Sequence, residues 1–358
     1  MSEARKPPLP VSAVNAHTHI YSGLVPLGMP PAEPSPADFL AILKQVWWRL
    51  DRALDHESVA ASARYYVANA LLHGTTGLID HHEAPNAIEG SLDVIGDVCQ
   101  ELGMPALLCY GATERNGGLD EARRGLAECK RFIESNQRPL VRGVVGLHAS
   151  FTVSDETLRA AGVMARDLDT VVHVHMAEDL ADVTHAVAAG HGHPLDRLLA
   201  CDALPAGSIL AHGVHMSPEQ MAVCNDRGLW LVHNPRSNEG NNVGWAGALV
   251  HADRVALGTD GWESCLADEV AAGERLAAAQ GESVAGVFAA RLAQGAALLD
   301  ERFGSQGAPT CARVGETLTI AGRDVVKAAE LLTGDEAAIR GAAERSAAEL
   351  WERMAAIT

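Results

Sequence analysis

Eight short apolar runs alternate with helical patterns along most of the chain. The runs lie at residues 11–17, 74–81, 105–112, 141–149, 170–176, 207–213, 228–234 and 253–260. Helical patterns fill the intervals at 58–72, 86–102, 119–134, 154–168, 179–189 and 217–227, and two more follow the last run at 263–279 and 282–299. Gly, Pro, Asn and Asp mark the joints between them. Strands that alternate with helices indicate right-handed βαβ units around a parallel sheet.

The number of these units favours a closed barrel. Eight units in roughly 250 residues match the size of a (β/α)8 barrel. A doubly wound open sheet is the alternative, but it would usually carry a GxGxxG turn after an early strand, and the chain has none. We therefore expect an α/β fold in which residues 1–300 form a (β/α)8 TIM barrel.

Two regions fall outside this pattern. Residues 36–54 predict an amphipathic helix whose Trp47 and Trp48 would roof a pocket, meet a partner subunit or simply pack. Residues 312–332 predict one hairpin and residues 335–356 a final helix. The expected apolar face of the hairpin consists of Val314, Glu316, Leu318 and Ile320. Because an isolated hairpin is marginal in water, we expect residues 301–358 to pack on the barrel or on a second subunit of a homodimer or higher homo-oligomer.

Charge and cysteine usage limit the classes of partner. The net charge is −18 and there is no run of Lys or Arg, which argues against nucleic acid. No apolar stretch of about 18 residues exists to span a membrane, and the first residues, MSEARKPPLP, lack an apolar signal core. The seven cysteines are scattered without a CxxC pair, which favours reduced thiols in the cytoplasm. Nucleic acid and membrane are therefore not expected as partners.

Polar residues end nearly every predicted strand. The set comprises His17, His19, His82, His148, His175, His212, His233 and Asp260. In a barrel these ends form the active-site face. Side chains two apart on a strand share a face, so His17 and His19 can chelate one ion. In VVHVHMAED, Glu178 follows His175 by three residues, and this stretch alone is either a strand leaving the core or a metal ligand followed by a proton carrier.

As an ordered set, several motifs resemble the amidohydrolase superfamily. They are NAHTHIYSGL, IDHHEAPNAIEGSL, GLHASFTVSDETL, HVHMAEDLADV, VHNPRSNEGNNVG and GTDG. The resemblance covers roughly residues 14–300. It is to the aminohydrolase branch, which includes atrazine and melamine chlorohydrolases, guanine deaminase, S-adenosylhomocysteine deaminase and the SsnA-type aminohydrolases. Members of this family usually carry a β-sandwich built from segments on both sides of the barrel. Since 16 residues precede His17, we expect the sandwich to be reduced or missing.

The resemblance implies a role for each matching residue. The metal ligands would be His17, His19, His175 and Asp260. His212 would polarise the substrate or position a water molecule, Glu178 would carry protons, and Asp260 would accept the proton of the water. Three neutral imidazoles and a carboxylate suit Zn²⁺ or Fe²⁺. Some members bridge two metals with a carboxylated lysine on strand 4, but none of Lys6, Lys44, Lys130 and Lys327 lies at a predicted strand end, so we expect one divalent transition metal per chain.

The implied reaction is a metal-dependent deamination. Activated water attacks an sp² carbon of an amino-substituted heterocycle and ammonia leaves, with Glu178 protonating the ring. The alternatives are a non-hydrolytic enzyme (a decarboxylase, isomerase or ring-opening lyase), hydrolysis of another C–N or C–Cl bond, and an inactive barrel that serves in a complex.

The substrate side is less specified. We expect contacts from His82, His148, His233, Arg236, Asn238 and Trp262, and Arg115 and Asn241 are further candidates on loops. Arg236 would hold a carboxylate or phosphate, or remain exposed to solvent. His81 should point away from the barrel mouth if His82 points in. His173 is expected to be a core histidine satisfied by a neighbour, and His191 and His193 are expected to be exposed.

Overall fold

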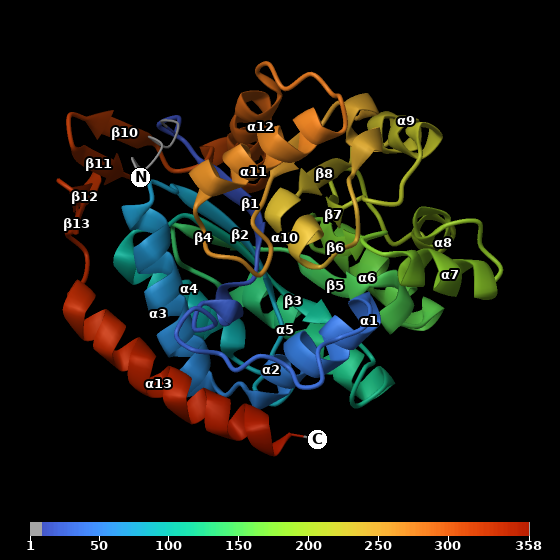
Figure 1. The fold of residues 1–358 in the computed structure, drawn as a ribbon, viewed down its shortest axis with the longest axis horizontal. Coiled ribbons are helices and arrows are strands. Elements are labelled where there is room, and N and C mark those ends of the chain that lie inside the picture. Colours follow the sequence, from blue (N-terminus) through green and yellow to red (C-terminus); the bar gives the residue numbers. More distant parts are fainter. Residues whose placement is uncertain (1–8, 358) are drawn as a thin grey trace.

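A closed ring of parallel strands forms the centre of the molecule in the computed structural model, which describes residues 9–357 (Figure 1). The strands are β1 (Val14–Thr18), β2 (Gly77–His82), β3 (Ala106–Ala112), β4 (Val141–Gly143), β5 (Val145–Ala149), β6 (Val172–Met176), β7 (Ile209–His212), β8 (Trp230–His233) and β9 (Val255–Leu257). Their hydrogen-bonded order is β1-β2-β3-β5-β6-β7-β8-β9, with β4 also pairing with β3. A parallel bridge between Thr18 and Asp260 closes the ring. The predicted TIM barrel is confirmed.

One predicted strand is divided. Residues 141–149 form β4 and β5, which pair with successive parts of β3. The N–H of Val144, between them, donates to the carbonyl of Leu108 at 2.9 Å, so the ladder with β3 continues across the break. Lys6 and most of the N-terminal stretch MSEARKPPLP lie outside the described residues.

Helices surround the barrel in Figure 1. They are α3 (His56–Leu72), α4 (Ser91–Leu102), α5 (Leu119–Ser135), α6 (Asp155–Asp167), α7 (Leu180–Ala188), α8 (Pro194–Ala200), α9 (Pro218–Asp226), α10 (Pro235–Gly240), α11 (Leu266–Ala279) and α12 (Val287–Phe303). Short 3₁₀ turns are η1 (Ile20–Ser22), η3 (Ser150–Thr152), η4 (Gly247–His251) and η5 (Gly304–Gln306). The sequence did not predict α8 and α10, which both begin with proline, a residue that suits the first helical position because it lacks an N–H.

The predicted helix at 36–54 is present and lies beside the barrel mouth. It consists of α1 (Phe39–Ile42), the π-helical turn η2 (Leu43–Trp47) and α2 (Trp48–Ala53). Its start is fixed by Asp38, whose carboxylate accepts the N–H of Ala41 at 2.8 Å. π-Helical turns are rare and are found frequently at functional sites.

The C-terminal region differs from the predicted hairpin. It forms a four-stranded antiparallel sheet of β10 (Cys311–Val314), β11 (Thr317–Ile320), β12 (Arg323–Lys327) and β13 (Glu330–Leu331), followed by α13 (Glu336–Ala356). The single-hairpin prediction is therefore wrong. Leu318 and Ile320 are buried as expected, but Val314 is 77% exposed because it lies at the tip of the β10–β11 turn.

Helix α13 packs along α3 and α2 through one apolar stripe (Figure 1). The buried members of this stripe are Ala343, Ala347, Leu350 and Met354. At its C-terminal end, the indole N–H of Trp351 donates to the carbonyl of Leu27 at 3.2 Å. The helix thus ties the end of the chain to the segment that follows β1.

We expect Leu350→Ala to lower the free energy of unfolding by about 2–5 kcal/mol, because the Leu350 side chain is fully buried and its loss leaves a cavity. Urea denaturation measures this change. Glu349→Ala, at the neighbouring exposed position of the same helix, is the matched control. Equal unfolding midpoints for the two variants would contradict the packing of α13.

Two smaller expectations can be compared with the structure. Within residues 9–357, the helices are all too short or too polar to cross a bilayer. Among residues 9–357, the seven cysteines form no disulfide, and six of them are buried.

Candidate metal centre and active site

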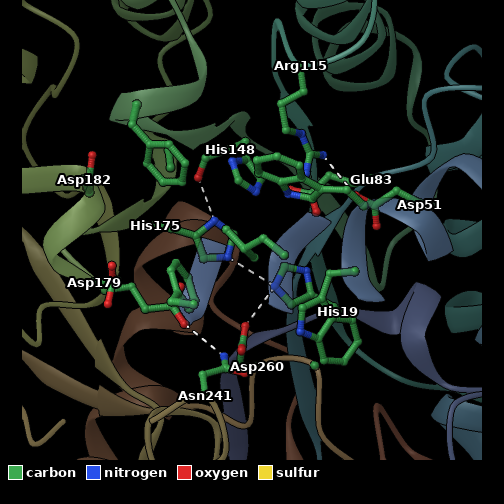
Figure 2. Close-up of a pocket in the computed structure, with 18 of the residues that line it drawn as sticks. His19, Asp51, Glu83, Arg115, His148, His175, Asp179, Asp182, Asn241 and Asp260 are labelled. Atoms are coloured by element: carbon green, nitrogen blue, oxygen red, sulfur yellow. Dashed lines mark hydrogen bonds and ion pairs between the residues drawn. The ribbon is translucent and has the colours of Figure 1, made fainter. Parts of the chain in front are cut away.

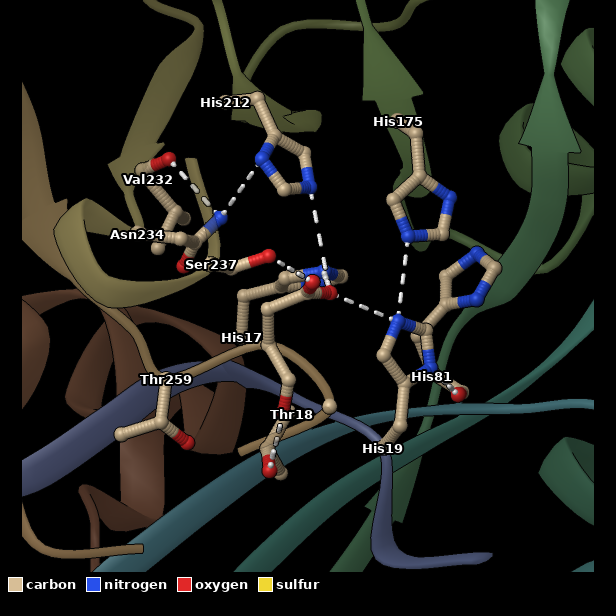
Figure 3. A network of polar contacts seen from close by, with 12 residues as sticks. His17, Thr18, His19, His81, His175, His212, Val232, Asn234, Ser237 and Thr259 are labelled. Carbon is tan, nitrogen blue, oxygen red and sulfur yellow. Dashed lines mark hydrogen bonds and ion pairs between the residues drawn. The ribbon is translucent and has the colours of Figure 1, made fainter. Parts of the chain in front are cut away.

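Four predicted ligands converge at the C-terminal end of the barrel. His17, His19, His175 and Asp260 each offer one atom, and these four atoms all lie within 4.8 Å of one another. Oδ1 of Asp260 is 3.1 Å from Nε2 of His17 and 2.9 Å from Nε2 of His19. Nε2 of His19 is 3.2 Å from Nε2 of His175, and these two rings face each other in Figure 3. The sequence placed these residues on three separate strand ends, and the barrel brings them together.

The Nδ1 atoms of His19 and His175 are held by backbone carbonyl groups, which leaves the Nε2 atoms available to a cation. Nδ1 of His19 lies 2.6 Å from the carbonyl oxygen of His81, and Nδ1 of His175 lies 2.6 Å from that of His148. Because a carbonyl only accepts, both Nδ1 atoms carry a proton, and a neutral ring of either residue then presents the lone pair of Nε2. Three neutral imidazoles and one carboxylate form a donor set that fits Zn²⁺ or Fe²⁺.

His173 contacts His17, one of the four converging residues. Its Nε2 is 2.9 Å from Nδ1 of His17, and its own Nδ1 is 3.8 Å from the thiol of Cys109. It is fully buried and satisfied by neighbours, as the sequence led us to expect. His173 therefore orients His17 and does not belong to the four converging residues.

We expect His173→Leu to weaken metal binding by roughly 10–100-fold, because His17 loses the partner that fixes its tautomer. A competition titration with a chromogenic chelator measures the affinity. His82→Leu is the matched control: His82 is also fully buried, but neither of its ring nitrogens has a hydrogen-bond partner among residues 9–357. If both variants bound metal equally well, His173 would have no positioning role.

His212 and Glu178 lie next to the converging ligands. Nδ1 of His212 is 2.9 Å from Oδ1 of Asn238, which leaves Nε2 directed at the centre (Figure 3). That Nε2 is 3.6 Å from Glu178 and 3.8 Å from Asp260. Asn238, predicted to contact substrate, is instead buried behind His212 and positions its ring.

The pKa of the Glu178 carboxyl is suited to proton transfer. Burial raises the pKa of Glu178 to about 7, and the nearby charge of Asp260 adds to this effect against the opposing influence of His212 and Asn241. The amide of Asn241 donates to Oε1 of Glu178 at 3.2 Å. A group with a pKa near neutrality can both give and take a proton at the pH of most cells.

The backbone is strained where these groups leave their strands. His212 has φ of 74°, Asp260 of 54° and Ala177 of 45°. L-residues rarely adopt this left-handed region, and each instance costs of order 1–3 kcal/mol. Ala177 lies between His175 and Glu178, and its N–H donates to Asp182 at 3.0 Å. This turn accounts for the three-residue interval in VVHVHMAED. It leaves His175 among the converging ligands and places Glu178 beside His212.

A small cavity of about 50 Å³ opens beside the centre (Figure 2). Its roof comes from the helical segment 39–53 and contains Phe39, Leu43, Trp47, Trp48 and Asp51. The walls include Tyr21, Glu83, Arg115, His148, Phe151, Asp179, Asp182 and Asn241. His148, one of the predicted substrate contacts, therefore lines this cavity. Its Nδ1 lies 3.0 Å from Oγ1 of Thr152.

The predicted orientations of the His81 and His82 side chains are wrong. His81 points to the centre, with its ring centroid 4.6 Å from that of His175. His82 instead packs against the rings of Tyr21 and Tyr110 and does not line the cavity. The reason is Gly111 on the neighbouring strand β3: a Cβ there would lie 2.4 Å from the His81 ring. The missing side chain leaves the space that His81 occupies.

Two further substrate predictions are corrected by partners that the sequence did not reveal. His233 does not face the cavity, because it packs against Trp245 and Phe288 and bonds to the guanidinium of Arg291. Arg236 is not free to hold an anion, because its guanidinium pairs with the buried Glu269.

Trp262 lies in a different cavity, of about 400 Å³, on the other side of Trp47. Tyr65 and Tyr66 of α3 form another wall of this second cavity. Trp262 is 45% exposed and is not among the residues that line the smaller cavity. His193, expected to be exposed, is buried because its Nε2 bonds to the carbonyl of His215 at 3.0 Å.

Sequence reasoning missed two acidic residues of the active-site cavity. Glu83 follows β2, is buried, and approaches both His81 and His148. It stands at a strand end, so the rule that located the other polar residues would have included it. Asp51 on α2 pairs with Arg115 at 3.0 Å, and nothing in the helical pattern distinguishes it from a surface carboxylate.

Curated proteins that resemble the sequence include two deaminases. An 8-oxoguanine deaminase from Pseudomonas aeruginosa is 30% identical over 239 residues, covering 63% of this chain and 52% of its own. A 5'-deoxyadenosine deaminase from Methanoregula boonei is 29% identical over 265 residues, covering 70% of this chain and 55% of its own. The chain thus spans about half the length of the curated relatives it matches.

Solved structures share the fold. An adenosine deaminase from Xanthomonas campestris with bound zinc has a TM-score of 0.79 at 22% identity and covers 97% of this chain and 85% of its own. An atrazine chlorohydrolase from Arthrobacter aurescens complexed with zinc has a TM-score of 0.73 at 19% identity, and it covers 96% of this chain and 88% of its own. A model of the amidohydrolase family matches residues 12–305, which include every strand of the barrel. The chain belongs to the amidohydrolase family.

Proposed function

We propose that the protein is a metal-dependent hydrolase that deaminates an amino-substituted heterocyclic small molecule. The observation that carries the proposal is the convergence of His17, His19, His175 and Asp260 beside a carboxyl group, Glu178, that is not one of the four. The names of the two curated relatives, an 8-oxoguanine deaminase and a 5'-deoxyadenosine deaminase, support the same reaction class.

The four converging residues would hold one divalent cation, Zn²⁺ or Fe²⁺. When bound, such an ion acts as a Lewis acid and lowers the pKa of water. The family and the zinc in two related structures support a metal, and the choice between zinc and iron is left to experiment.

The protein's own groups would divide the proton transfers. Asp260 accepts the proton of the attacking water through Oδ1, while the hydroxyl of Ser237 donates to its other oxygen. His212 accepts a hydrogen bond from the water at Nε2, because its Nδ1 proton is engaged by Asn238. Glu178 donates a proton to the ring nitrogen next to the attacked carbon. A C–O bond forms and the exocyclic C–N bond breaks, and the amino group leaves as ammonia with the proton that Asp260 received from the water. The proton of the new hydroxyl returns to Glu178 as the keto product forms.

Ammonia release across a panel of amino-substituted purines, pyrimidines and triazines tests this function. The protein is loaded separately with Zn²⁺ and Fe²⁺, and the chelator-stripped protein serves as the control. We expect at least one compound to yield stoichiometric ammonia and a hydroxylated or keto product. A panel that includes chlorotriazines reports chloride release in the same samples. Metal-loaded protein that releases no ammonia from any compound would contradict the proposal, and chloride without ammonia would indicate dechlorination instead.

A further inference from the structure

We infer that Arg115 binds an acceptor oxygen of the substrate, so that the amino-heterocycle carries a carbonyl or carboxylate oxygen on the part that lies away from the converging ligands. The inference rests on the proposed function for the reaction itself. The contact with Arg115, however, can be measured by binding alone.

Arg115 shares a cavity with the converging ligands. It lies in the loop between β3 and α5 and lines the same cavity as His19, His175 and Asp260. Figure 2 shows its side chain at one end of the group of lining residues and Asp260 at the other. Since the cavity measures about 50 Å³, a small molecule that fills it contacts both ends.

The guanidinium of Arg115 has more donors than partners. Nη2 donates to Oδ2 of Asp51 at 3.0 Å, whereas Nε and Nη1 are buried and have no hydrogen-bond partner among residues 9–357. Even a bidentate pair with Asp51 would engage only two of the three nitrogens and leave the third free. A guanidinium donates and never accepts, so its counterpart in a ligand must be an acceptor. Leaving a buried charged donor unpaired is costly, which favours a ligand that supplies this acceptor.

The neighbours of Arg115 fix its position without satisfying it. Its Cζ lies 4.9 Å from the centre of the Trp48 ring, and Trp48 and Asp51 both belong to α2. The Arg115 side chain is only 5% exposed, so the roof helix holds the donors in place before a ligand arrives. Glu83 shares the cavity, but its carboxylate accepts the hydroxyl of Tyr21 at 3.1 Å and lies 3.1 Å from Nδ1 of His81.

An sp² oxygen is the acceptor that suits a planar guanidinium. A carbonyl or carboxylate oxygen offers two lone pairs and can meet N–H groups from neighbouring nitrogens. Because Asp51 already provides a counter-charge, the contact does not require a negative charge on the ligand. Carbonyl and carboxylate share this chemistry, and the compounds below distinguish them.

Two series of compounds test the inference in the full-length chain loaded with Zn²⁺. The first comprises 2,4-diamino-1,3,5-triazine, its 6-oxo derivative and its 6-carboxylate, and the second comprises adenine, 2-oxoadenine and 8-oxoadenine. Calorimetry measures binding, and kcat/KM for ammonia release replaces it for any compound that is turned over. A hydrogen bond to a charged group changes affinity by roughly 10–100-fold, so we expect an oxygen-bearing member of at least one series to exceed its parent ring by this factor.

A double variant isolates the contribution of Arg115. Asp51→Asn is the reference, because Asp51 would otherwise be left buried without its counter-charge. In Asp51→Asn/Arg115→Met the new side chain keeps an apolar stem but has no N–H donor. We expect the advantage of the oxygen-bearing compound to persist in Asp51→Asn and to fall by roughly tenfold or more in the double variant, while the parent ring binds equally to both.

Two further variants complete the comparison. Arg123→Met on α5, where the arginine side chain is 62% exposed, is the matched control and should leave the advantage unaltered. If the double variant fails to fold, Arg115→Lys takes its place. Lysine keeps the charge beside Asp51 but lacks the planar set of donors, so this variant should lose most of the advantage.

The outcomes separate the two proposals. Oxygen-bearing compounds that bind selectively but release no ammonia would refute the deaminase function and support the contact with Arg115. Equal binding of oxygen-bearing and parent compounds in both series would overturn the contact, as would failure of every compound to bind. An advantage that survives the loss of Arg115 would overturn it as well. An equal loss for the parent ring would show that Arg115 only maintains the structure.

Discussion

Replacement of Glu178 by Gln is expected to lower turnover by about 10²–10⁴-fold while the protein keeps its metal, because Gln retains size and hydrogen bonding but cannot carry a proton. The structure places the Glu178 carboxyl 3.6 Å from His212 and holds one of its oxygens with Asn241. Gln can form both contacts, so substrate affinity should change little. Steady-state kinetics and elemental analysis on the same preparation measure the two effects.

Glu57→Gln provides the control for this substitution. Glu57 is an exposed residue in the first turn of α3, and its replacement should alter neither turnover nor metal content. If Glu178→Gln turned over normally, Glu178 would not be the proton carrier. If it lost its metal, Glu178 would act as a ligand and our division of roles would be wrong.

His175→Ala is expected to produce a protein with little bound metal and no detectable turnover. His175 supplies one of three imidazoles, and its Nε2 lies 3.2 Å from that of His19. Without it, three of the four converging groups remain, and cation affinity falls because the missing ligand is replaced only by solvent. Elemental analysis after purification without chelator measures the loss.

The matched control is His185→Ala on α7, where the histidine is exposed. That variant should keep the metal content and activity of the parent protein. A His175→Ala protein that retained its full complement of metal would show that the cation is bound elsewhere. Together with Glu178→Gln, this pair assigns separate roles to two residues that are three positions apart.

The barrel and the converging groups could be predicted because they depend on periodicity. The alternation of apolar runs with helical patterns specifies parallel strands, and polar residues at strand ends then meet at one face. His17, His19, His175 and Asp260 were located in this way, although they span most of the chain. Their roles as ligands remain predictions until a metal is measured.

Tertiary partners account for what the sequence did not predict. The orientation of His81 depends on the absence of a side chain at Gly111, which lies on a different strand. The exclusion of Arg236 from the cavity depends on Glu269, which is distant in sequence. Neither relationship has a local pattern.

The roof and the second sheet were only partly predicted. The helix at 36–54 was expected, but its π-helical turn and the buried pair of Asp51 with Arg115 were not. The four strands after residue 310 are short, and only Leu318 and Ile320 show the alternation of a buried face. Strands of this length give too few positions for periodicity to separate them.

Titration of metal-free protein with Zn²⁺ or Fe²⁺, with bound metal and ammonia release followed in the same samples, tests the central claim most directly. The account predicts that activity rises in proportion to bound metal and reaches its plateau at one equivalent per chain. Activity in the metal-free protein, or a plateau only at two equivalents, would contradict a single catalytic metal held by His17, His19, His175 and Asp260.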